Sequence, residues 1–274
     1  MTGDTQTCYD ELASHYHLIF EDWEASITRQ AAALSVVLQR ECGPASDVRV
    51  LDCACGIGTQ ALGLAKLGFQ MSGCDVSPGA IERAQMEASQ RSLDIQLSVA
   101  NMLDLERIPD SNFDAVICID NALPHLESNE QLVQASTQIR SKLRDGGLFV
   151  ASLRDYDRLV LEKPVVQPPS FYSNHAGHSN HGGRRIVFQV WDWVDDRHYV
   201  FHLYITRQIE TGWQTLHYAA PYRALLRDEL TNALAQAGFV DIRWLDPSET
   251  GFYPARTPLA ARHQVVLAKN RGIR

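Results

Sequence analysis

The sequence has no excess of basic residues and no long apolar run. It contains 25 Lys and Arg against 33 Asp and Glu, which gives a formal net charge of −8. Because nucleic-acid binding depends on clusters of Lys and Arg that neutralise phosphates, we expect no nucleic-acid partner. No apolar stretch approaches the ~20 residues of a membrane-spanning helix, and the N-terminus lacks the basic-then-apolar layout of a signal peptide. These absences predict a soluble, cytoplasmic protein with no membrane partner.

The sequence also lacks the spacing of a metal site. Cys53 and Cys55 are separated by one residue, but no second pair follows at the distance that zinc sites use. His175, His178 and His181 recur at every third position, yet the glycines and asparagines between them predict a loop and not a helix that could gather them. We therefore expect no metal, and we expect the cysteines to be free thiols.

No internal repeat is present, and 45% of the 274 residues are hydrophobic, which suffices for one large core or for one core with an inserted cap. From residue 48 onward, runs typical of strands alternate with runs typical of helices, as in a parallel sheet with crossover helices. We expect strands at 48–53, 70–75, 95–99, 113–119 and 147–153, and helices near 59–67, 78–91 and 127–143.

Beyond residue 155 the pattern changes to long strands joined by tight turns. We expect antiparallel strands at 185–194, 198–209 and 213–218, then a helix at 222–237 and strands at 240–245 and 263–269. Prolines at 164, 168 and 169 predict a crossing without secondary structure, followed by a loop at 173–183. These elements divide the chain into an N-terminal helical segment (1–45), an α/β domain (46–155 and 222–274) and an inserted antiparallel cap (156–221).

Residues 50–60, Val-Leu-Asp-Cys-Ala-Cys-Gly-Ile-Gly-Thr-Gln, form the most informative segment. An apolar strand leads into Asp52, and glycines at 56 and 58 allow a tight turn that a ligand can approach closely, before a helix that directs N–H groups at that ligand. The segment resembles the nucleotide loop of class I S-adenosylmethionine-dependent methyltransferases, Leu-Asp-x-x-Cys-Gly-x-Gly. A dinucleotide fingerprint would have its third glycine where Ala61 stands, and Asp52 would repel a pyrophosphate. We therefore expect S-adenosylmethionine as the cofactor.

Polar residues at the ends of the next strands complete the predicted cofactor site. Asp75 ends the second strand, where an acidic side chain can accept both ribose hydroxyls. Asn101 and Met102 follow the third strand, and we expect an amide contact to the adenine edge and an apolar wall. The predicted cofactor contacts are Tyr9, Tyr16, Arg29, Asp52, Ala54, Gly56, Gly58, Asp75, Val76, Asn101, Met102, Ile119 and Asp120.

Three further segments narrow the resemblance. They read Phe-Asp-Ala-Val-Ile-Cys-Ile-Asp-Asn-Ala-Leu-Pro-His-Leu (113–126), Leu-Arg-Asp-Gly-Gly-Leu (143–148) and Leu-Arg-Asp-Tyr-Asp (153–157). Together they resemble the glycine N-methyltransferases, including bacterial glycine/sarcosine methyltransferases, over about residues 9–160. The resemblance implies an α/β fold: a Rossmann-like, seven-stranded methyltransferase sheet whose last strand is antiparallel and inserts beside the sixth. An antiparallel three-stranded cap would follow the fifth strand.

The same resemblance implies a lid over the methionine end of the cofactor. Tyr9, Tyr16 and Arg29 occupy its positions, but Tyr16 stands about where the family has tryptophan, so Trp23 competes for that place. An amphipathic helix whose aromatic residues only pack in the core is the alternative.

The resemblance also implies the acceptor site. Arg154 would hold a substrate carboxylate through a two-bond fork, and Asn121 would orient the amine. Tyr204 would face the acceptor, as Tyr218 and Tyr222 could. His125 could hold Asn121 in place, contact the cofactor carboxylate or act as a base. A plain ion pair between Arg154 and a carboxylate at 155 or 157 is the alternative.

These residues predict transfer of a methyl group from S-adenosylmethionine to the amine of a small carboxylate-bearing molecule, such as glycine, sarcosine or a similar amino acid. The transfer is an in-line displacement in which positioning supplies most of the catalysis. Two alternatives stay open. One is a small-molecule O-, S- or N-methyltransferase with a larger acceptor, for which Phe188, Trp191 and Trp193 could line an apolar pocket. The other is a binding module without turnover. A homo-oligomer is also open, since glycine N-methyltransferases are oligomeric.

Overall fold

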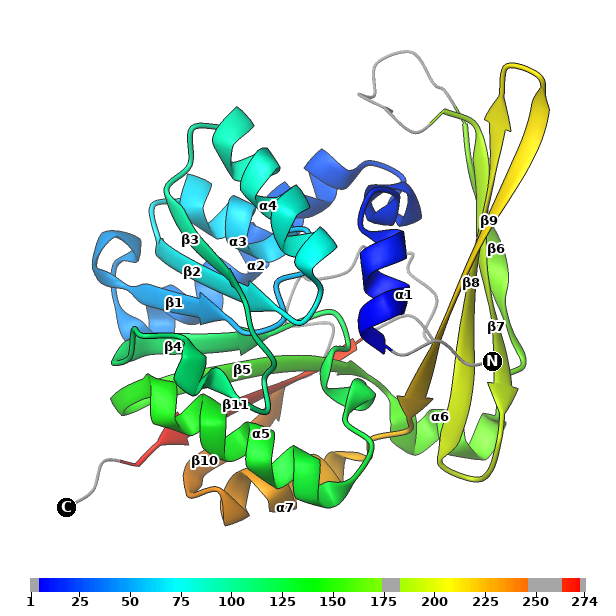
Figure 1. Ribbon diagram of the computed structural model, residues 1–274. Coiled ribbons are helices and arrows are strands. Elements are labelled where there is room, and N and C mark those ends of the chain that lie inside the picture. The colour runs from blue at the N-terminus through cyan, green and yellow to red at the C-terminus, as the bar shows by residue number, and fades with distance from the viewer. Residues whose placement is uncertain (1–4, 174–182, 246–262, 272–274) are drawn as a thin grey trace.

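The computed structural model describes residues 5–173, 183–245 and 263–271, which contain two separate sheets (Figure 1). The larger sheet has the strand order β10-β11-β5-β4-β1-β2-β3. Its strands are β1 (Arg49–Asp52), β2 (Gln70–Asp75), β3 (Ile95–Val99), β4 (Phe113–Cys118), β5 (Leu143–Arg154), β10 (Phe239–Leu245) and β11 (His263–Asn270). β11 lies antiparallel between β5 and β10, while β1 to β5 pair in parallel. The predicted seven-stranded sheet with its antiparallel last strand is confirmed.

Helices cover both faces of this sheet. The helices in the described part of the chain are α1 (Thr5–Leu12), α2 (Trp23–Cys42), α3 (Thr59–Lys66), α4 (Pro78–Gln90), α5 (Asn129–Lys142), α6 (Tyr156–Glu162) and α7 (Arg227–Gln236), with short 3-10 turns at Tyr16–Ile19, Ala45–Asp47, Leu105–Arg107 and Leu123–His125. In β4, Val116 and Cys118 join the core beneath α5, while Ala115 and Ile117 join the core beneath α2. Both faces of β4 are therefore buried, which is why residues 115–118 form a continuous apolar run. Within the described residues, no helix combines the length and the apolar character needed to cross a bilayer.

The second sheet is antiparallel and has four strands, β6 (Val166–Tyr172), β7 (Arg185–Trp193), β8 (His198–Ile209) and β9 (Gly212–Arg223). We call these four strands the cap sheet. The predicted three-stranded cap was wrong by one strand, because Pro168 and Pro169 lie in β6 and not in a structureless crossing. β6 is an edge strand with a register shift between Gln167 and Ser170, and an edge tolerates prolines that cannot donate to the ladder. The predicted loop at 173–183, with its three histidines, falls almost wholly outside the described residues.

The predicted helix at 222–237 was wrong at its start. β9 continues through Arg223, and α7 begins only at Arg227. Helix α6, directly after β5, was not predicted. α1 lies between the carboxyl edge of the large sheet and the cap sheet, where it contacts β9 and α4 (Figure 1). The ends of β1, β2, β4 and β5 therefore face α1 and the cap across a common space.

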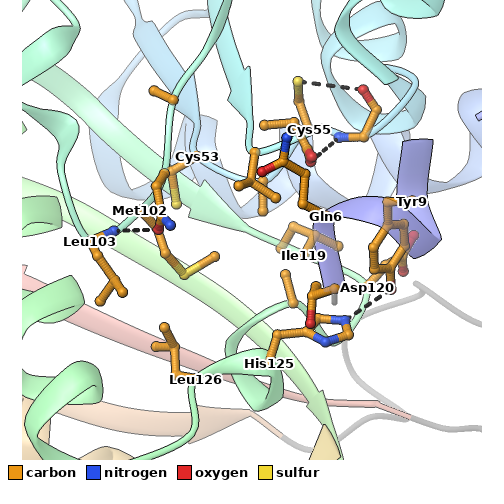
Figure 2. Close-up of a pocket in the computed structure, with 18 of the residues that line it drawn as sticks. Gln6, Tyr9, Cys53, Cys55, Met102, Leu103, Ile119, Asp120, His125 and Leu126 are labelled. Atoms are coloured by element: carbon orange, nitrogen blue, oxygen red, sulfur yellow. Dashed lines mark hydrogen bonds between the residues drawn. The ribbon is translucent and has the colours of Figure 1, made fainter. Parts of the chain in front are cut away.

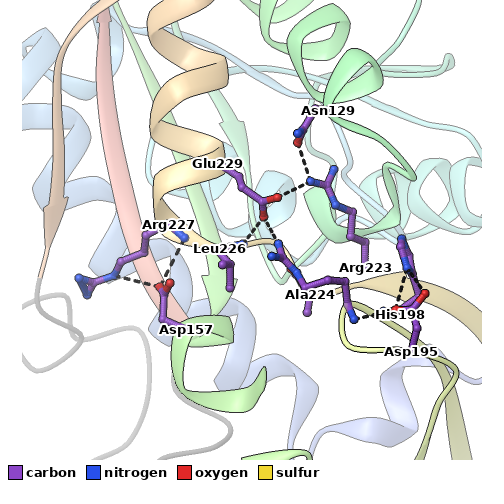
Figure 3. A network of polar contacts seen from close by, with 10 residues as sticks. Asn129, Asp157, Asp195, His198, Arg223, Ala224, Leu226, Arg227 and Glu229 are labelled. Carbon is purple, nitrogen blue, oxygen red and sulfur yellow. Dashed lines mark hydrogen bonds and ion pairs between the residues drawn. The ribbon is translucent and has the colours of Figure 1, made fainter. Parts of the chain in front are cut away.

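A polar network joins the cap sheet to the helices of the large sheet (Figure 3). Arg223 at the end of β9 donates to Glu229 of α7 at 2.7 Å and to Asn129 at the start of α5 at 2.5 Å. Arg197, from the turn between β7 and β8, also pairs with Glu229 and donates to the carbonyl oxygen of Ala224 at 3.0 Å. Burial opposes ionisation of Glu229, but the Leu226 N–H and both arginines hold the pKa of its carboxyl below the ordinary value.

Candidate cofactor and acceptor cavities

Two cavities meet at the carboxyl edge of the large sheet. The first, of about 340 Å³, lies over the ends of β1 to β4; we call it the cofactor cavity. The second, of about 630 Å³, lies between the N-terminal helices, the end of β5 and the cap sheet; we call it the acceptor cavity. Tyr9, Tyr16 and Asp120 line both cavities. A group leaving one cavity for the other would pass these three side chains.

The glycine loop forms one wall of the cofactor cavity. Gly56 has a φ of +51°, and a Cβ added there would meet no atom within 4 Å, so its backbone is open to a ligand. Its N–H donates to Asp75 Oδ2 at 2.8 Å, and the Ser77 N–H donates to Asp75 Oδ1 at 3.0 Å. Burial raises the pKa of Asp75, and these backbone bonds oppose that rise. The carboxylate of Asp75 is thus fixed at the cavity wall, next to Val76.

Two predicted cofactor residues lie beneath the loop and do not line the cavity. Asp52 is fully buried; its Oδ1 accepts a long bond from the Ala54 N–H at 3.4 Å, and Oδ2 has no partner among the described residues. Burial raises the pKa of Asp52 to about 8. Gly58, with a φ of +92°, packs against the side chains of Leu62 and Ala84. Both residues shape the loop from below, while Ala54 lines the cavity itself.

The opposite wall is largely apolar (Figure 2). It comprises Met102, Leu103, Ile119 and Leu126. The side-chain oxygen of Asn101 accepts a bond from the Leu103 N–H at 2.9 Å. This oxygen was predicted to accept from adenine, but it already forms a local turn. Met102 and Ile119 line this cavity, on a surface suited to a planar heterocycle.

The charges of the cofactor cavity select a cationic ligand. Asp75, Asp120 and Glu127 line it, whereas no Lys or Arg does so among the described residues. A pyrophosphate would be repelled by these carboxylates, while a sulfonium with an ammonium group would be attracted. The open Gly56 backbone, the fixed Asp75 carboxylate and the apolar surface around Met102 fit S-adenosylmethionine.

The end of β4 adopts an unusual backbone conformation. Asp120 and Asn121 have φ values of +57° and +69°, in the left-handed region where non-glycine residues are uncommon. Asn121 is buried; its Oδ1 accepts the backbone N–H of Arg154 at 3.0 Å, and its amide donates to the Tyr156 hydroxyl at 3.0 Å. The bend directs Asp120 between the two cavities, where the Gln60 amide donates to it at 2.8 Å. Backbone strain of this kind is typical of functional sites.

The guanidinium of Arg154 lies at the wall of the acceptor cavity among neutral groups. It is 4.8 Å from the Trp191 ring centroid and 5.5 Å from that of Phe201. Its nitrogens donate to the Tyr199 hydroxyl at 3.4 Å and to Gln189 Oε1 at 3.2 Å.

No carboxylate among the described residues pairs with Arg154. The alternative ion pair with Asp155 or Asp157 does not form: Asp155 caps α6, and Asp157 is 4.0 Å from Arg227. Arg154 is also partly buried, so water solvates its charge only in part. Cations in such sites are normally paired with an anion, so Arg154 provides a site for one.

His125 connects the two cavities through hydrogen bonds. Its Nε2 lies 2.9 Å from the Tyr9 hydroxyl, which lies 3.0 Å from the Tyr222 hydroxyl (Figure 2 shows the first contact). Its Nδ1 lies 3.2 Å from the Pro221 carbonyl oxygen. Burial lowers the pKa of His125 to about 4, so the imidazole is neutral at neutral pH. His125 forms no hydrogen bond with Asn121, so of its three possible roles the support of Asn121 is not observed.

The predicted lid residues separate into two groups. Tyr9 and Tyr16 line both cavities, as expected of a lid. Arg29 lines only the acceptor cavity; it donates to Ser26 Oγ at 2.9 Å, and its Nε is buried with no partner in the described chain. Trp23 lines neither cavity, because it is buried against α3 and its indole donates to Thr59 Oγ1 at 2.9 Å. Tyr16 therefore holds the position for which Trp23 competed.

Tyr204 does not lie where it was predicted. It lines neither cavity and stacks on Phe188 and His217 at 4.9 and 4.6 Å between ring centroids. Successive residues of a strand point to opposite faces, and the inward face of β8 carries Phe201 and Leu203. Tyr222, which the sequence offered as a second candidate, lines the acceptor cavity in its place.

Several residues that line the cavities carry little signal in the sequence. They are Thr5, Gln6, Thr59 and Gln60 in the first cavity, and Gln167, Gln189, Phe201 and His263 in the second. His263 of β11 lies opposite Arg154 of β5 in the strand register. Burial lowers the pKa of His263 to about 3. The Tyr156 hydroxyl accepts a hydrogen bond from Asn121. Tyr156 belongs to the segment 153–157, which carried part of the family resemblance. The others come from helices and strands whose partners local sequence does not specify.

The strand order, the antiparallel β11 and a carboxylate-lined cavity over the glycine loop define a class I methyltransferase fold, whose members use S-adenosylmethionine. Residues 50–147 match the family described as "Methyltransferase domain". Over residues 50–147 the chain therefore carries a methyltransferase domain.

Known proteins support this assignment. The chain is similar to a glycine/sarcosine N-methyltransferase of Parasynechococcus marenigrum, with 32% identity over 51% of this chain and 48% of that protein. It is similar to the glycine N-methyltransferase of Homo sapiens, with 34% identity over 41% of this chain and 42% of that protein. The chain thus spans about half the length of the curated relatives it matches. A crystal structure of an S-adenosylmethionine-dependent methyltransferase from Clostridium acetobutylicum shares the fold, with a TM-score of 0.71, 15% identity and coverage of 97% of this chain and 100% of that one.

Proposed function

We propose that this protein transfers a methyl group from S-adenosylmethionine to the amine of a small molecule that carries a carboxylate, such as an amino acid. The observation that carries the proposal is Arg154, a cation among neutral groups at the wall of the acceptor cavity. The names of the relatives, which are glycine and sarcosine N-methyltransferases, agree with an acceptor of this kind.

The cofactor supplies an electrophilic methyl group on a sulfonium. Asp75 would accept the ribose hydroxyls, because its carboxylate is held at the wall by two backbone N–H groups and keeps further lone pairs. Met102 and Ile119 would flank the adenine. Arg29, whose Nε lacks a partner in the described chain, would hold the carboxylate of the methionine end.

The acceptor would bind on the other side of Tyr9 and Tyr16. The fork of Arg154 would hold its carboxylate, exchanging the weak bonds to Tyr199 and Gln189 for charge-assisted ones. Its amine would then lie near Asp120, where the cavities meet. No strong acid is needed, because the group that leaves is a neutral thioether, so orientation and exclusion of water supply the catalysis. In this arrangement the N-terminal helices act as a lid and the cap sheet forms the acceptor wall.

The experiment is Arg154→Lys, measured as S-adenosylhomocysteine formation with an amino acid acceptor. Lysine keeps the charge but loses the fork, so we expect the acceptor KM to rise at least tenfold while the cofactor KM changes less than twofold. Arg158→Lys is the matched control, since Arg158 pairs with Glu162 on the surface. An unchanged acceptor KM refutes the role of Arg154. Binding of S-adenosylhomocysteine without turnover of any amine would indicate a binding module instead.

A further inference from the structure

The acceptor cavity is much larger than the smallest amino acids require. Glycine has five non-hydrogen atoms, and at about 30 Å³ for each atom, the share of a water molecule in the liquid, it occupies about 150 Å³. The cavity has about 630 Å³. The part around Arg29 is assigned above to the methionine end of the cofactor, but the part facing the cap sheet remains. Pockets of several hundred Å³ are typical of ligands much larger than glycine.

Besides the polar side chains of Gln167, Ser170 and Gln189, a group of apolar side chains lines the space that remains. They are Ile19 and Phe20 from the N-terminal segment, Tyr172 from β6, Val187 from β7 and Leu203 from β8. We call these five residues the apolar wall. Tyr172 donates to the Ile19 carbonyl oxygen at 3.3 Å, so β6 and the N-terminal segment close one end together.

The strand register places the apolar wall beside Arg154. Gln189, which accepts from the guanidinium at 3.2 Å, pairs with Leu203 across β7 and β8. Val187 points to the same face two residues along β7, about 7 Å further on. The wall therefore begins next to the anion site and extends away from it by about the length of a side chain.

Three sites thus surround the acceptor cavity. Arg154 is the site for a carboxylate, the junction at Asp120 and Tyr222 is the site for an amine, and the apolar wall is left for a third group. An α-amino acid carries a carboxylate, an amine and a side chain on one carbon. An α-amino acid held at the first two sites would place its side chain against the apolar wall.

We propose that the acceptor is an α-amino acid with a large apolar side chain, branched aliphatic or aromatic, and not glycine or sarcosine. This inference rests on the proposed function and names its substrate class. The lone pair of the neutral α-amine forms the new N–CH₃ bond, and the sulfonium sulfur keeps the electron pair of the broken S–CH₃ bond. The product is an N-methylammonium that retains the positive charge, together with a neutral thioether. Glycine would leave the apolar wall in contact with water, and each methylene buried there favours binding by about fourfold.

The test compares glycine, sarcosine, alanine, leucine and phenylalanine as acceptors at saturating S-adenosylmethionine, with kcat/KM measured from S-adenosylhomocysteine formation. We expect leucine or phenylalanine to exceed glycine at least tenfold. A highest value for glycine or sarcosine overturns this inference and leaves the proposed function standing. Turnover of amines without a carboxylate, together with no turnover of any amino acid, overturns the proposed function itself.

A variant tests the apolar wall directly. Val187→Phe fills it and should lower the ratio of kcat/KM for phenylalanine to that for glycine at least tenfold. Val194→Phe is the matched control, because Val194 is 70% exposed just beyond β7 and should leave the ratio unchanged. Should Val187→Phe not fold, Leu203→Ala removes apolar contact instead and should lower the same ratio at least threefold. An unchanged ratio in the folded variant contradicts the inference.

Discussion

The Tyr9 hydroxyl lies 2.9 Å from Nε2 of His125, and this contact determines the direction of a hydrogen-bond chain. The Pro221 carbonyl can only accept, so Nδ1 of the neutral imidazole carries the proton and Nε2 accepts from Tyr9. Since Tyr9 has one proton, Tyr222 must donate to Tyr9. The Tyr222 oxygen therefore presents lone pairs to the acceptor cavity, where it can accept a hydrogen bond from an amine N–H.

This direction predicts the effect of Tyr222→Phe. Without the hydroxyl oxygen, the amine loses one acceptor, so kcat/KM for the acceptor should fall about tenfold, the value of one hydrogen bond to a charged or strongly polar group. Cofactor affinity should change less than twofold. Tyr218→Phe is the control on the same strand, because the Tyr218 hydroxyl contacts His15 and lines neither cavity. Equal kinetics for the two variants would contradict the assigned direction.

The raised pKa of Asp52 predicts that the stability of the protein depends on pH. Its pKa in the folded protein is about 8, against about 3.9 in an unfolded chain, so the folded state keeps a proton that the unfolded state loses. The stabilisation is fully present below pH 3.9 and is lost as the pH rises through 8. Asp52→Asn stays neutral, so its unfolding free energy relative to wild type should rise by about 3 kcal/mol from pH 5 to pH 8.

Urea unfolding at both pH values measures this difference. Asp94→Asn is the control, since Asp94 is exposed and should give the same difference from wild type at pH 5 and pH 8. A parallel pH response of Asp52→Asn and wild type would mean that Asp52 ionises normally in the folded protein.

The ion pairs of Glu229 predict how strongly the cap sheet is held to the helices of the large sheet. Its carboxylate pairs with Arg223, whose side chain is 8% exposed, and with Arg197. Glu229→Gln leaves both arginines without this anion, so the unfolding free energy should fall by about 2 kcal/mol. Glu162→Gln, which breaks the surface pair with Arg158, should cost less than about 0.5 kcal/mol. Comparable losses in chemical unfolding of the two variants would mean that the network contributes no more than a surface pair.

Local signals were enough to predict most of the large sheet. Ser77 accepts from the Ala80 N–H at the start of α4, as its place before Pro78 indicates. The predicted bounds of β1 to β4 agree with the structure to within one residue, whereas β5 begins at Leu143, four residues before the predicted start. β6 was missed because prolines forbid a central strand, and sequence alone does not say which strand lies at an edge.

The cofactor cavity and the acceptor cavity also differ in how far the sequence predicts them. Gly56 and Asp75 follow from a short motif at the ends of neighbouring parallel strands. The surroundings of Arg154 depend on Gln189 and Tyr199, which are 35 and 45 residues away in the chain. The choice between Tyr204 and Tyr222 depended on which face of β8 and β9 turns inward. Alternation tells which residues share a face, but the packing of the cap against α1 decides which face is buried.

Asp75 gives the sharpest test of the cofactor cavity. In Asp75→Asn, one carboxylate oxygen becomes an amide NH₂, which cannot accept from Gly56 or Ser77 and presents a donor where the ribose hydroxyls also need an acceptor. Affinity for S-adenosylhomocysteine, measured by calorimetry, should fall at least thirtyfold, while the acceptor KM at saturating cofactor should change less than threefold. Glu106→Gln, an exposed acidic residue outside both cavities, should bind normally. Normal binding by Asp75→Asn would show that the ribose is held by other groups.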